Sequence, residues 1–267
     1  MNTVEDRIAI LKKQDKWIPN SSLIKTPEMI EGIRVSGVIN TGVLDAVAQE
    51  IKAGMSTLDI DKIVYDYTIA HGAIPAPLNY EGFPKSVCTS IKDVVCHGIP
   101  RADEILKEGD IINVDVSTIY KGYFSDASRM FMIGEVSPEA KKLVEGTLEL
   151  LELAASQLKP YDDINTVGRI IEPAAKAMGF SVVRELCGHG VGNEFHEKPD
   201  VVHFKSKYEG MIMVPGMVFT IEPMINQGHK NIVMKGDWGV KTRDGKLSAQ
   251  WEHTFVMTET GLEVLTH

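Results

Sequence analysis

Four acidic residues are the strongest candidates for chemistry, because each lies in a stretch that otherwise reads as an apolar β-strand. They are Asp115 in INVDVS, Asp126 in YFSDAS, Glu222 in FTIEPM and Glu252 in QWEHTF. A carboxylate in such a strand costs free energy unless a cation or hydrogen-bond donors replace its lost hydration. Four negative charges are balanced by two divalent cations, which carboxylates hold in two-metal sites. The sequence therefore indicates a dinuclear metal centre.

The first two acids are predicted to lie close together on a β-hairpin. Lys121-Gly122 can form its two-residue turn, and opposed residues then have numbers that sum to 243. This register places Asp115 opposite Ser128 and diagonal to Asp126, on one face of the sheet. Taken alone, the hairpin favours reading Asp126 as a loop acid instead. The same anomaly returns at Glu222, 107 residues after Asp115, and this repetition favours the metal site.

His189 is the candidate nitrogen ligand, because the glycines around it in CGHGVG let the backbone bring the imidazole close to a site. A single histidine is more simply explained as a hydrogen-bonded loop or core residue, and only the four acids favour ligation. His97 in CHGIP and His196 in FHEKP lie near glycine or proline, which predicts loops. There an imidazole could bind a substrate carbonyl, its oxyanion or the scissile nitrogen. We assign the remaining histidines to surface or structural positions: His71, His203, His229, His253 and His267.

Two pairs of helices, each followed by β-rich segments, are expected to position these residues. Thr26-Pro27-Glu28 and Ser137-Pro138-Glu139 have the hydroxyl cap, proline and acid typical of a helix start. The second helix of each pair should end before Gly72 and Gly179. The two starts are 111 residues apart and the two stops 107, so we expect an α/β chain of two related halves. The first helix should run to about residue 52 with one apolar face, formed by Ile30, Ile33, Val38, Val43, Leu44, Val47 and Ile51.

Composition excludes several classes of protein. The 267 residues contain 28 Lys and Arg against 37 Asp and Glu, and a net charge of −9 gives no basis for a nucleic-acid site. The longest apolar runs are about four residues, whereas ~18 are needed to span a membrane. The first 23 residues do not resemble a targeting peptide, and the three cysteines lack CxxC spacing. We therefore expect a cytoplasmic, single-domain protein with reduced thiols, and we expect it to be a monomer.

Seven motifs together resemble those of the type I methionine aminopeptidases. In chain order they are CHGIP, INVDVS, GYFSDASR, CGHGVG, FHEKP, FTIEPM and SAQWEHTF, and the similarity runs over about residues 24–264. The resemblance implies the pita-bread fold, in which two pseudo-symmetric α/β halves surround a curved antiparallel sheet. The catalytic domain would span residues 24–267, with halves at about 24–135 and 136–264, after an N-terminal extension at 1–23. By resemblance, the metal ligands are Asp115, Asp126, His189, Glu222 and Glu252.

The resemblance also implies the reaction, which is removal of the initiator methionine from nascent peptides with a small second residue. Two divalent ions, bridged by Asp126 and Glu252, would lower the pKa of a water molecule. Glu222 would accept its proton, His196 would stabilise the oxyanion, and His97 would contact the released nitrogen. The ribosome is a candidate partner. The implied methionine pocket, for which plain core packing is the alternative, contains Tyr80, Phe83, Cys88, Phe195 and Trp238, with His97 and His196 beside it.

Two departures from the family pattern limit this transfer. Phe83 stands in EGFP where many relatives have tyrosine, so we expect no hydroxyl contact at the pocket rim. Lys92 replaces an asparagine that is common near a monovalent-cation site, to which Ser248 would also contribute. Binding of one monovalent cation is therefore an open expectation.

Two other functions compete with the aminopeptidase. A Xaa-Pro dipeptidase-like hydrolase would share the fold but usually carries a large extra N-terminal domain, which residues 1–23 cannot supply. A non-catalytic binding protein on the same scaffold would usually lack ligands, whereas all five are present here. The sequence does not name the metal, because Co, Mn, Fe and Zn all suit an oxygen-rich site with one imidazole.

Overall fold

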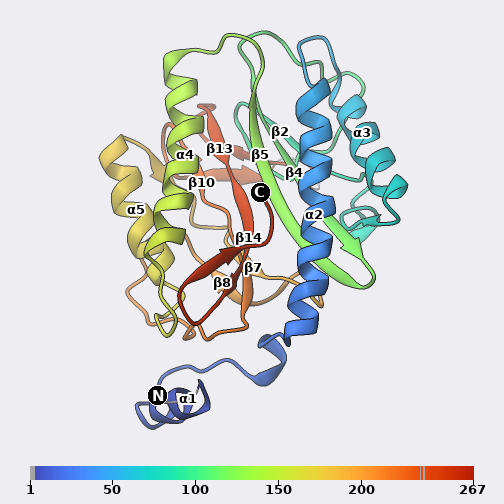
Figure 1. The fold of residues 1–267 in the computed structure, drawn as a ribbon. Coiled ribbons are helices and arrows are strands. Elements are labelled where there is room, and N and C mark those ends of the chain that lie inside the picture. The colour runs from blue at the N-terminus through green and yellow to red at the C-terminus, as the bar shows by residue number, and fades with distance from the viewer. Residues whose placement is uncertain (1–3, 235, 237) are drawn as a thin grey trace.

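The computed structural model describes residues 4–234, 236 and 238–267. Its secondary structure comprises two short 3-10 helices, at Ser21–Leu23 and Tyr80–Gly82, and the α-helices and strands shown in Figure 1. The α-helices are α1 (Val4–Lys13), α2 (Pro27–Glu50), α3 (Thr57–Ala70), α4 (Pro138–Gln157) and α5 (Thr166–Met178). Helices α2 to α5 are the two predicted helix pairs. Helices α2 and α4 begin at the predicted prolines, α2 ends two residues before the expected residue 52, and α3 and α5 end before Gly72 and Gly179 as predicted.

A curved antiparallel sheet forms the centre of the molecule. Its strands follow the order β1-β4-β5-β14-β9-β7-β8, while β15 pairs with β14 and β2 with β4. These strands are β1 (Ile74–Pro75), β2 (Cys88–Ile91), β4 (Ile111–Tyr120), β5 (Tyr123–Met132), β7 (Gly188–Gly190), β8 (Glu197–Val201), β9 (Val218–Ile221), β14 (Glu252–Met257) and β15 (Leu262–Val264).

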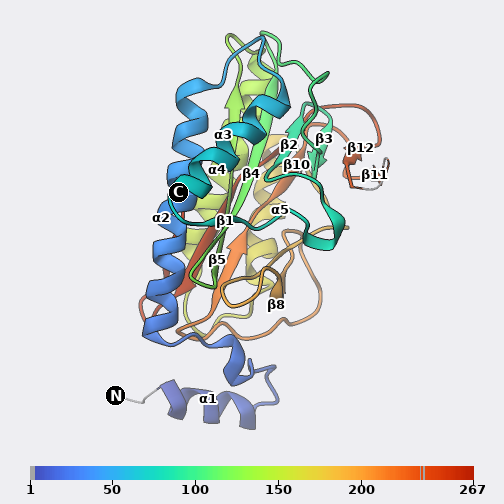
Figure 2. The same ribbon diagram turned by 90° about the vertical axis from the view of Figure 1, so that its right-hand side faces the viewer.

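Two three-stranded sheets complete the strand arrangement. One joins β13 (Ser248–Gln250), β10 (Met224–Asn226) and β6 (Ser181–Val182), and the other joins β11 (Ile232–Met234), β12 (Val240–Thr242) and β3 (Val94–Cys96). The second of these sheets lies on the side of the large sheet away from α2, as Figure 2 shows.

The predicted hairpin register is confirmed. Strands β4 and β5 pair antiparallel with Asp115 opposite Ser128, and Ser117 opposite Asp126. Asp126 is therefore a strand residue, and the reading of it as a loop acid is wrong. Lys121 and Gly122 form the turn with positive φ angles of 50° and 85°. Positive φ at both central residues is typical of a type I′ turn.

The helix starts are also as predicted. The side chains of Thr26 and Ser137 accept hydrogen bonds from the third residue of α2 and α4, and proline occupies the first helical position of each. Helix α5 ends at Gly179, whose φ of 88° is the left-handed cap conformation that glycine adopts without strain.

The predicted apolar face of α2 needs one correction, at Val38, which is 67% exposed. The buried stripe instead includes two polar residues, Ser36 and Asn40. The Ser36 hydroxyl donates to the carbonyl of Thr118 in β4, and the Asn40 amide donates to that of Val116. Val38 is two residues from each of these polar residues, or about 200° around the helix, and therefore lies on the solvent side.

The helices form two pairs that lie on different sheets. Helices α2 and α3 pack on β1, β4 and β5 of the large sheet, and α4 and α5 pack mainly against the sheet of β6, β10 and β13. In Figure 1, α2 and α3 lie on the right and α4 and α5 on the left, with β4, β5 and β14 between them. One buried cluster lies under α2 and α3 and includes Val43, Leu44 and Ile60, and a larger one lies under α4 and α5. Among the described residues, no helix combines the length and apolar character needed to cross a membrane.

The first 23 residues contain α1, which lies at the lower edge of the body in Figure 1. They contact the rest of the chain through the Lys16–Glu209 ion pair, at 2.7 Å, and through the Trp17 carbonyl, which accepts the Ile212 amide. The division into an extension and a domain of two related halves stays a prediction.

Helix α2 approaches the C-terminal segment closely at Gly37, and a substitution there would test this contact. A Cβ at this position would lie 2.2 Å from the backbone oxygen of Leu265, which cannot move as a side chain can. Although alanine normally stabilises a helix relative to glycine, we expect Gly37→Ala to lower the free energy of unfolding by about 2 kcal/mol, measured by urea denaturation. Gly146→Ala in α4 is the control, since its Cβ would meet only the side chains of Phe180 and Met178 at 3.2 and 3.4 Å. Equal effects of the two substitutions would contradict the proposed backbone clash.

Candidate metal centre

The candidate ligands come from five strands that are neighbours in the large sheet, in the order β4, β5, β14, β9 and β7. Asp115 lies in β4, Asp126 in β5 and Glu252 at the start of β14. Glu222 follows Ile221, the last residue of β9, and His189 is the middle residue of β7. Adjacent strands are about 5 Å apart, so five strands of a flat sheet would span about 20 Å, and the curvature of this sheet is what brings side chains on one face together.

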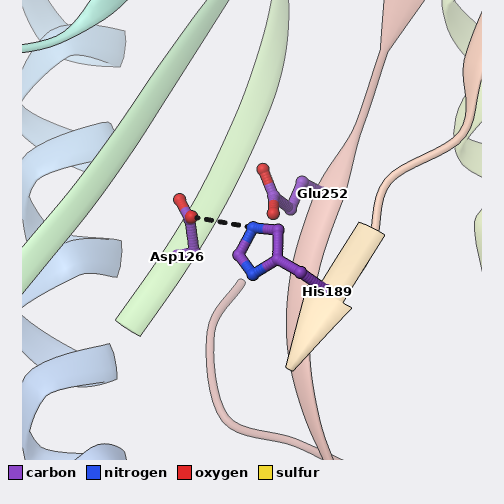
Figure 3. Close-up of side chains that lie close together, drawn as sticks. All are labelled: Asp126, His189 and Glu252. Atoms are coloured by element: carbon purple, nitrogen blue, oxygen red, sulfur yellow. Dashed lines mark ion pairs between the residues drawn. The ribbon is translucent and has the colours of Figure 1, made fainter. Parts of the chain in front are cut away.

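The five side chains line one cavity of about 410 Å³. His189 Nε2 lies 3.7 Å from Asp126 Oδ2 and 3.6 Å from Glu222 Oε1. Ligand atoms of Asp126, His189 and Glu252 all lie within 4.8 Å of one another, and Figure 3 shows these three side chains pointing toward a common centre. Such spacing leaves room for a cation between the groups.

Without a bound cation, burial and mutual repulsion disfavour the ionised form of the four carboxylates. Burial raises the pKa of Asp115 to about 7 and that of Glu222 to about 8. Burial and the charge of neighbouring acids raise the pKa values of Asp126 and Glu252 well above the usual range. A pKa shifted upward in this way means that the charged form is destabilised, and a bound cation would reverse the shift.

The donor set fits divalent metal ions. Glu252 Oε1 is buried and has no hydrogen-bond partner among the described residues, so it offers a free lone pair. None of the described residues that line the cavity is a lysine or arginine that could neutralise the acids. Burial also lowers the pKa of His189 to about 4, so its imidazole is neutral at pH 7 and able to bind metal.

Residues outside the predicted set hold the ligands in place. The Thr220 hydroxyl donates to Glu222 Oε1 at 2.8 Å, and the Gln250 amide donates to Glu222 Oε2 at 3.0 Å. His203 Nε2 accepts the backbone N–H of Glu222 at 3.0 Å, and the Ser117 hydroxyl donates to Asp126 at 2.8 Å. His203 is buried, consistent with its assignment to a structural position, but its contact with the site had no signal in the sequence.

The two predicted substrate histidines line the same cavity. His97 follows the last residue of β3, and His196 precedes β8, so both lie outside strands as expected. His196 Nδ1 lies 3.1 Å from the Tyr80 hydroxyl, and its ring centroid is 4.4 Å from that of His189. Burial lowers the pKa values of His97 and His196, which favours neutral imidazoles at pH 7.

The five predicted pocket residues also line this cavity. Tyr80 meets Phe195 edge-on at 4.8 Å between ring centroids, and Phe83 meets Trp238 in the same way at 5.3 Å. Cys88 is buried in β2, where it lies opposite Asp115 of β4. Cys96 and Cys187 also line the cavity, one and two positions from His97 and His189. Further lining residues that carried no signal in the sequence are Leu186, Met224 and Gln250.

Lys92 adopts a left-handed conformation with φ of 56°, which asparagine tolerates better than lysine. Its ammonium group lies 2.5 Å from Asp110, and its carbonyl accepts the backbone N–H of Ser248 at 2.8 Å. Binding of a monovalent cation beside Lys92 stays a prediction.

Comparison with known proteins places this geometry in a family. Residues 31–259 match metallopeptidase family M24. The methionine aminopeptidase of Escherichia coli K12 is 48% identical over 245 residues, which cover 91% of this chain and 93% of that protein. Methionine aminopeptidase A of Synechocystis is 49% identical over 238 residues, covering 89% of this chain and 94% of that protein.

Solved structures agree with the sequence relatives. The methionine aminopeptidase of Rickettsia prowazekii superposes with a TM-score of 0.89 at 39% identity, over 91% of this chain and 99% of that one. The prolidase of Pyrococcus furiosus gives a TM-score of 0.71 at 25% identity, over 92% of this chain but only 65% of that one. The predicted pita-bread fold is thereby confirmed. The chain belongs to metallopeptidase family M24 and, within it, to the methionine aminopeptidases.

Proposed function

We propose that this chain removes the N-terminal methionine from peptides by hydrolysis that depends on two divalent cations. The observation that carries the proposal is the convergence of four carboxylates and one neutral imidazole in a single cavity without a counter-charge from the described lining residues. The residues that would hold the ions are Asp115, Asp126, His189, Glu222 and Glu252. Their oxygen-rich donor set suits Co, Mn, Fe or Zn.

When bound, the ions would supply a nucleophile by lowering the pKa of a water molecule. Glu222 is the proton acceptor in this proposal, because its carboxylate lies in the cavity among the candidate ligands, within reach of a water molecule held there. Thr220 and Gln250 orient its two oxygens, and His203 fixes its backbone.

The neutral histidines bind the polar atoms of the scissile peptide. His196 stabilises the oxygen that becomes negatively charged, and its Tyr80 contact sets the orientation of the ring. His97 contacts the nitrogen that is released. Asp115 lies at the place where the free α-amino group of the substrate would bind, which restricts cleavage to N-terminal residues.

The aromatic lining selects the methionine side chain. A thioether packs well against the rings of Tyr80, Phe83, Phe195 and Trp238 and against the soft sulfur of Cys88. Because Phe83 contributes no hydroxyl, selection at this side of the cavity rests on shape and dispersion. Nascent peptides with a small second residue are the proposed substrates, in the cytoplasm and with the ribosome as a candidate partner of a monomeric enzyme.

Removing one predicted ligand should abolish the reaction. We expect Asp126→Ala to reduce hydrolysis of a Met-Ala-Ser tripeptide by at least about 1,000-fold and to lower the bound metal measured by elemental analysis. Asp110→Asn is the matched control, because Asp110 is also a buried acid but pairs with Lys92 outside the cavity lining. Full activity of Asp126→Ala would refute the two-metal assignment.

Substrate choice separates the two candidate hydrolases. The wild-type protein, stripped of metal and then supplied with each candidate ion in turn, should cleave Met-Ala-Ser and leave an Ala-Pro dipeptide intact, as followed by chromatography of the products. Faster cleavage of Ala-Pro would favour the Xaa-Pro dipeptidase instead.

The metal-free protein should lose stability as pH rises from 6.5 to 8.5. Asp115 and Glu222 have folded-state pKa values of about 7 and 8, above the ~4 of an unfolded chain, so the folded state alone holds these protons in this range. Their contribution is present at low pH and is lost as pH rises through the folded values. His189, with a folded pKa of about 4, changes stability only below about 6.5. We expect a loss of at least about 3 kcal/mol in urea unfolding, because Asp126 and Glu252, whose pKa values are also raised, add to the effect.

Saturating metal should remove this pH dependence, and Asp115→Asn should reduce it, because each eliminates a proton that only the folded state binds. A constant free energy of unfolding of the metal-free protein between pH 6.5 and 8.5 would contradict the raised pKa values of the buried acids.

A further inference from the structure

A buried ion pair joins the start of α2 to the segment that carries His196. Lys25 Nζ lies 2.6 Å from Glu197 Oε2, and the two side chains are only 1% and 12% exposed. Lys25 lies two residues before α2, and Glu197 is the first residue of β8. Burying two charges costs several kcal/mol per ion before their attraction compensates. An apolar pair would therefore hold the two segments together at a lower cost in free energy.

The second oxygen of Glu197 holds the backbone next to His196. Glu197 Oε1 accepts the N–H groups of Asn193 and Glu194 at 2.9 and 3.2 Å. These residues lie between β7, which carries His189, and β8. One carboxylate therefore satisfies two backbone donors of a turn and, through its other oxygen, anchors that turn to a lysine of a different segment.

The turn packs tightly on α2 at Gly192. A Cβ at Gly192 would lie 2.6 Å from Ile33 Cδ1 of α2 and 3.3 Å from Lys25 Cε. The Gly192 carbonyl accepts the N–H of Phe124 in β5, at 2.8 Å. The turn is thus held from β5, from α2 and from Lys25, although it has little regular strand pairing of its own.

His196 depends on this turn for its position. Its ring stacks on that of Phe195 at 4.2 Å between centroids, and its Nδ1 lies 3.1 Å from the Tyr80 hydroxyl. It is adjacent in sequence to Glu197 and borders the cavity of the metal centre. A shift of the turn would therefore move the imidazole relative to the substrate oxygen.

We propose that Lys25 and Glu197 are positioning residues that hold the turn at residues 192–196 and thereby place His196 for the reaction. The inference rests on the proposed function, because His196 acts there on the substrate. A displacement of about 1 Å in such a group can reduce a rate about 100-fold. The ion pair supplies directional hydrogen bonds, which an apolar pair of the same volume would not.

The test is a double-mutant cycle with His196. We expect Lys25→Met and Glu197→Gln each to lower kcat for Met-Ala-Ser about 10- to 100-fold, with little change in KM or in bound metal. In a His196→Ala background the same substitutions should cost less than about twofold, because residues acting through one group are not additive. Hydrogen exchange at the amides of Asn193 and Glu194 should accelerate in Glu197→Ala, independently of activity.

Asp163 and Arg169 provide a matched control. Asp163 also accepts two backbone N–H groups, those of Asn165 at 2.9 Å and Gly210 at 3.1 Å, while its other oxygen pairs with Arg169. Neither residue lines the cavity. Arg169→Met should therefore lower stability while leaving kcat unchanged.

The outcomes distinguish failure of the proposed function from failure of the positioning role. A wild-type protein that does not cleave Met-Ala-Ser refutes the proposed function itself. Cleavage by the wild type, with unchanged kcat in the variants or with losses that are fully additive to His196→Ala, refutes only the positioning role. If Lys25→Met does not fold, the cycle is run with Lys25→Met/Glu197→Gln, which leaves no unpaired buried charge and must show the same dependence on His196.

Discussion

Repulsion between buried carboxylates is the constraint around which this protein is built. Asp115, Asp126, Glu222 and Glu252 meet in one cavity, and their raised pKa values record the cost of that arrangement. A folded chain tolerates such a cluster only when the rest of the structure is stable enough to hold it. The two helix pairs and their apolar clusters supply that stability. In β4, Ile112, Val114 and Val116 belong to the cluster under α2 and α3, and they alternate with Asp115, which therefore points to the other face of the strand.

The site lies where the two predicted halves meet. Within the large sheet, the contact between them is the pairing of β5 with β14, in which Glu252 is opposite Ser128. Asp115 and Asp126 come from one side of this seam, and His189, Glu222 and Glu252 come from the other. Neither half alone contains the full donor set, so a complete centre requires the correct register across one short strand pairing.

The candidate metal ligands and the candidate substrate histidines lie in different kinds of structure. The candidate ligands lie in strands or directly beside them, where the backbone ladder fixes their positions, whereas His97 and His196 lie in turns. A turn has fewer backbone hydrogen bonds to define its geometry, and this explains why the His196 segment is anchored by a buried charge pair. The pocket also draws on different kinds of structure, because Tyr80 begins a short 3-10 helix, Trp238 lies outside helices and strands, and Cys88 lies in a strand.

The sequence by itself determined the local features of this protein. Proline-capped helix starts, glycine stops, the β4–β5 register and the acids misplaced in apolar strands all depend on neighbours in the chain, and each was predictable from them. The exposure of Val38 also follows from helical periodicity, although the predicted apolar face included this residue. The contact of His203 with Glu222 and the pairing of Lys25 with Glu197 were not predictable in this way. Lys25 and Glu197 are separated by 172 residues, and only the closing of the sheet brings them together. Which groups share a cavity is decided by strand order and by the packing of α2, because local propensity carries no information about contacts between distant segments.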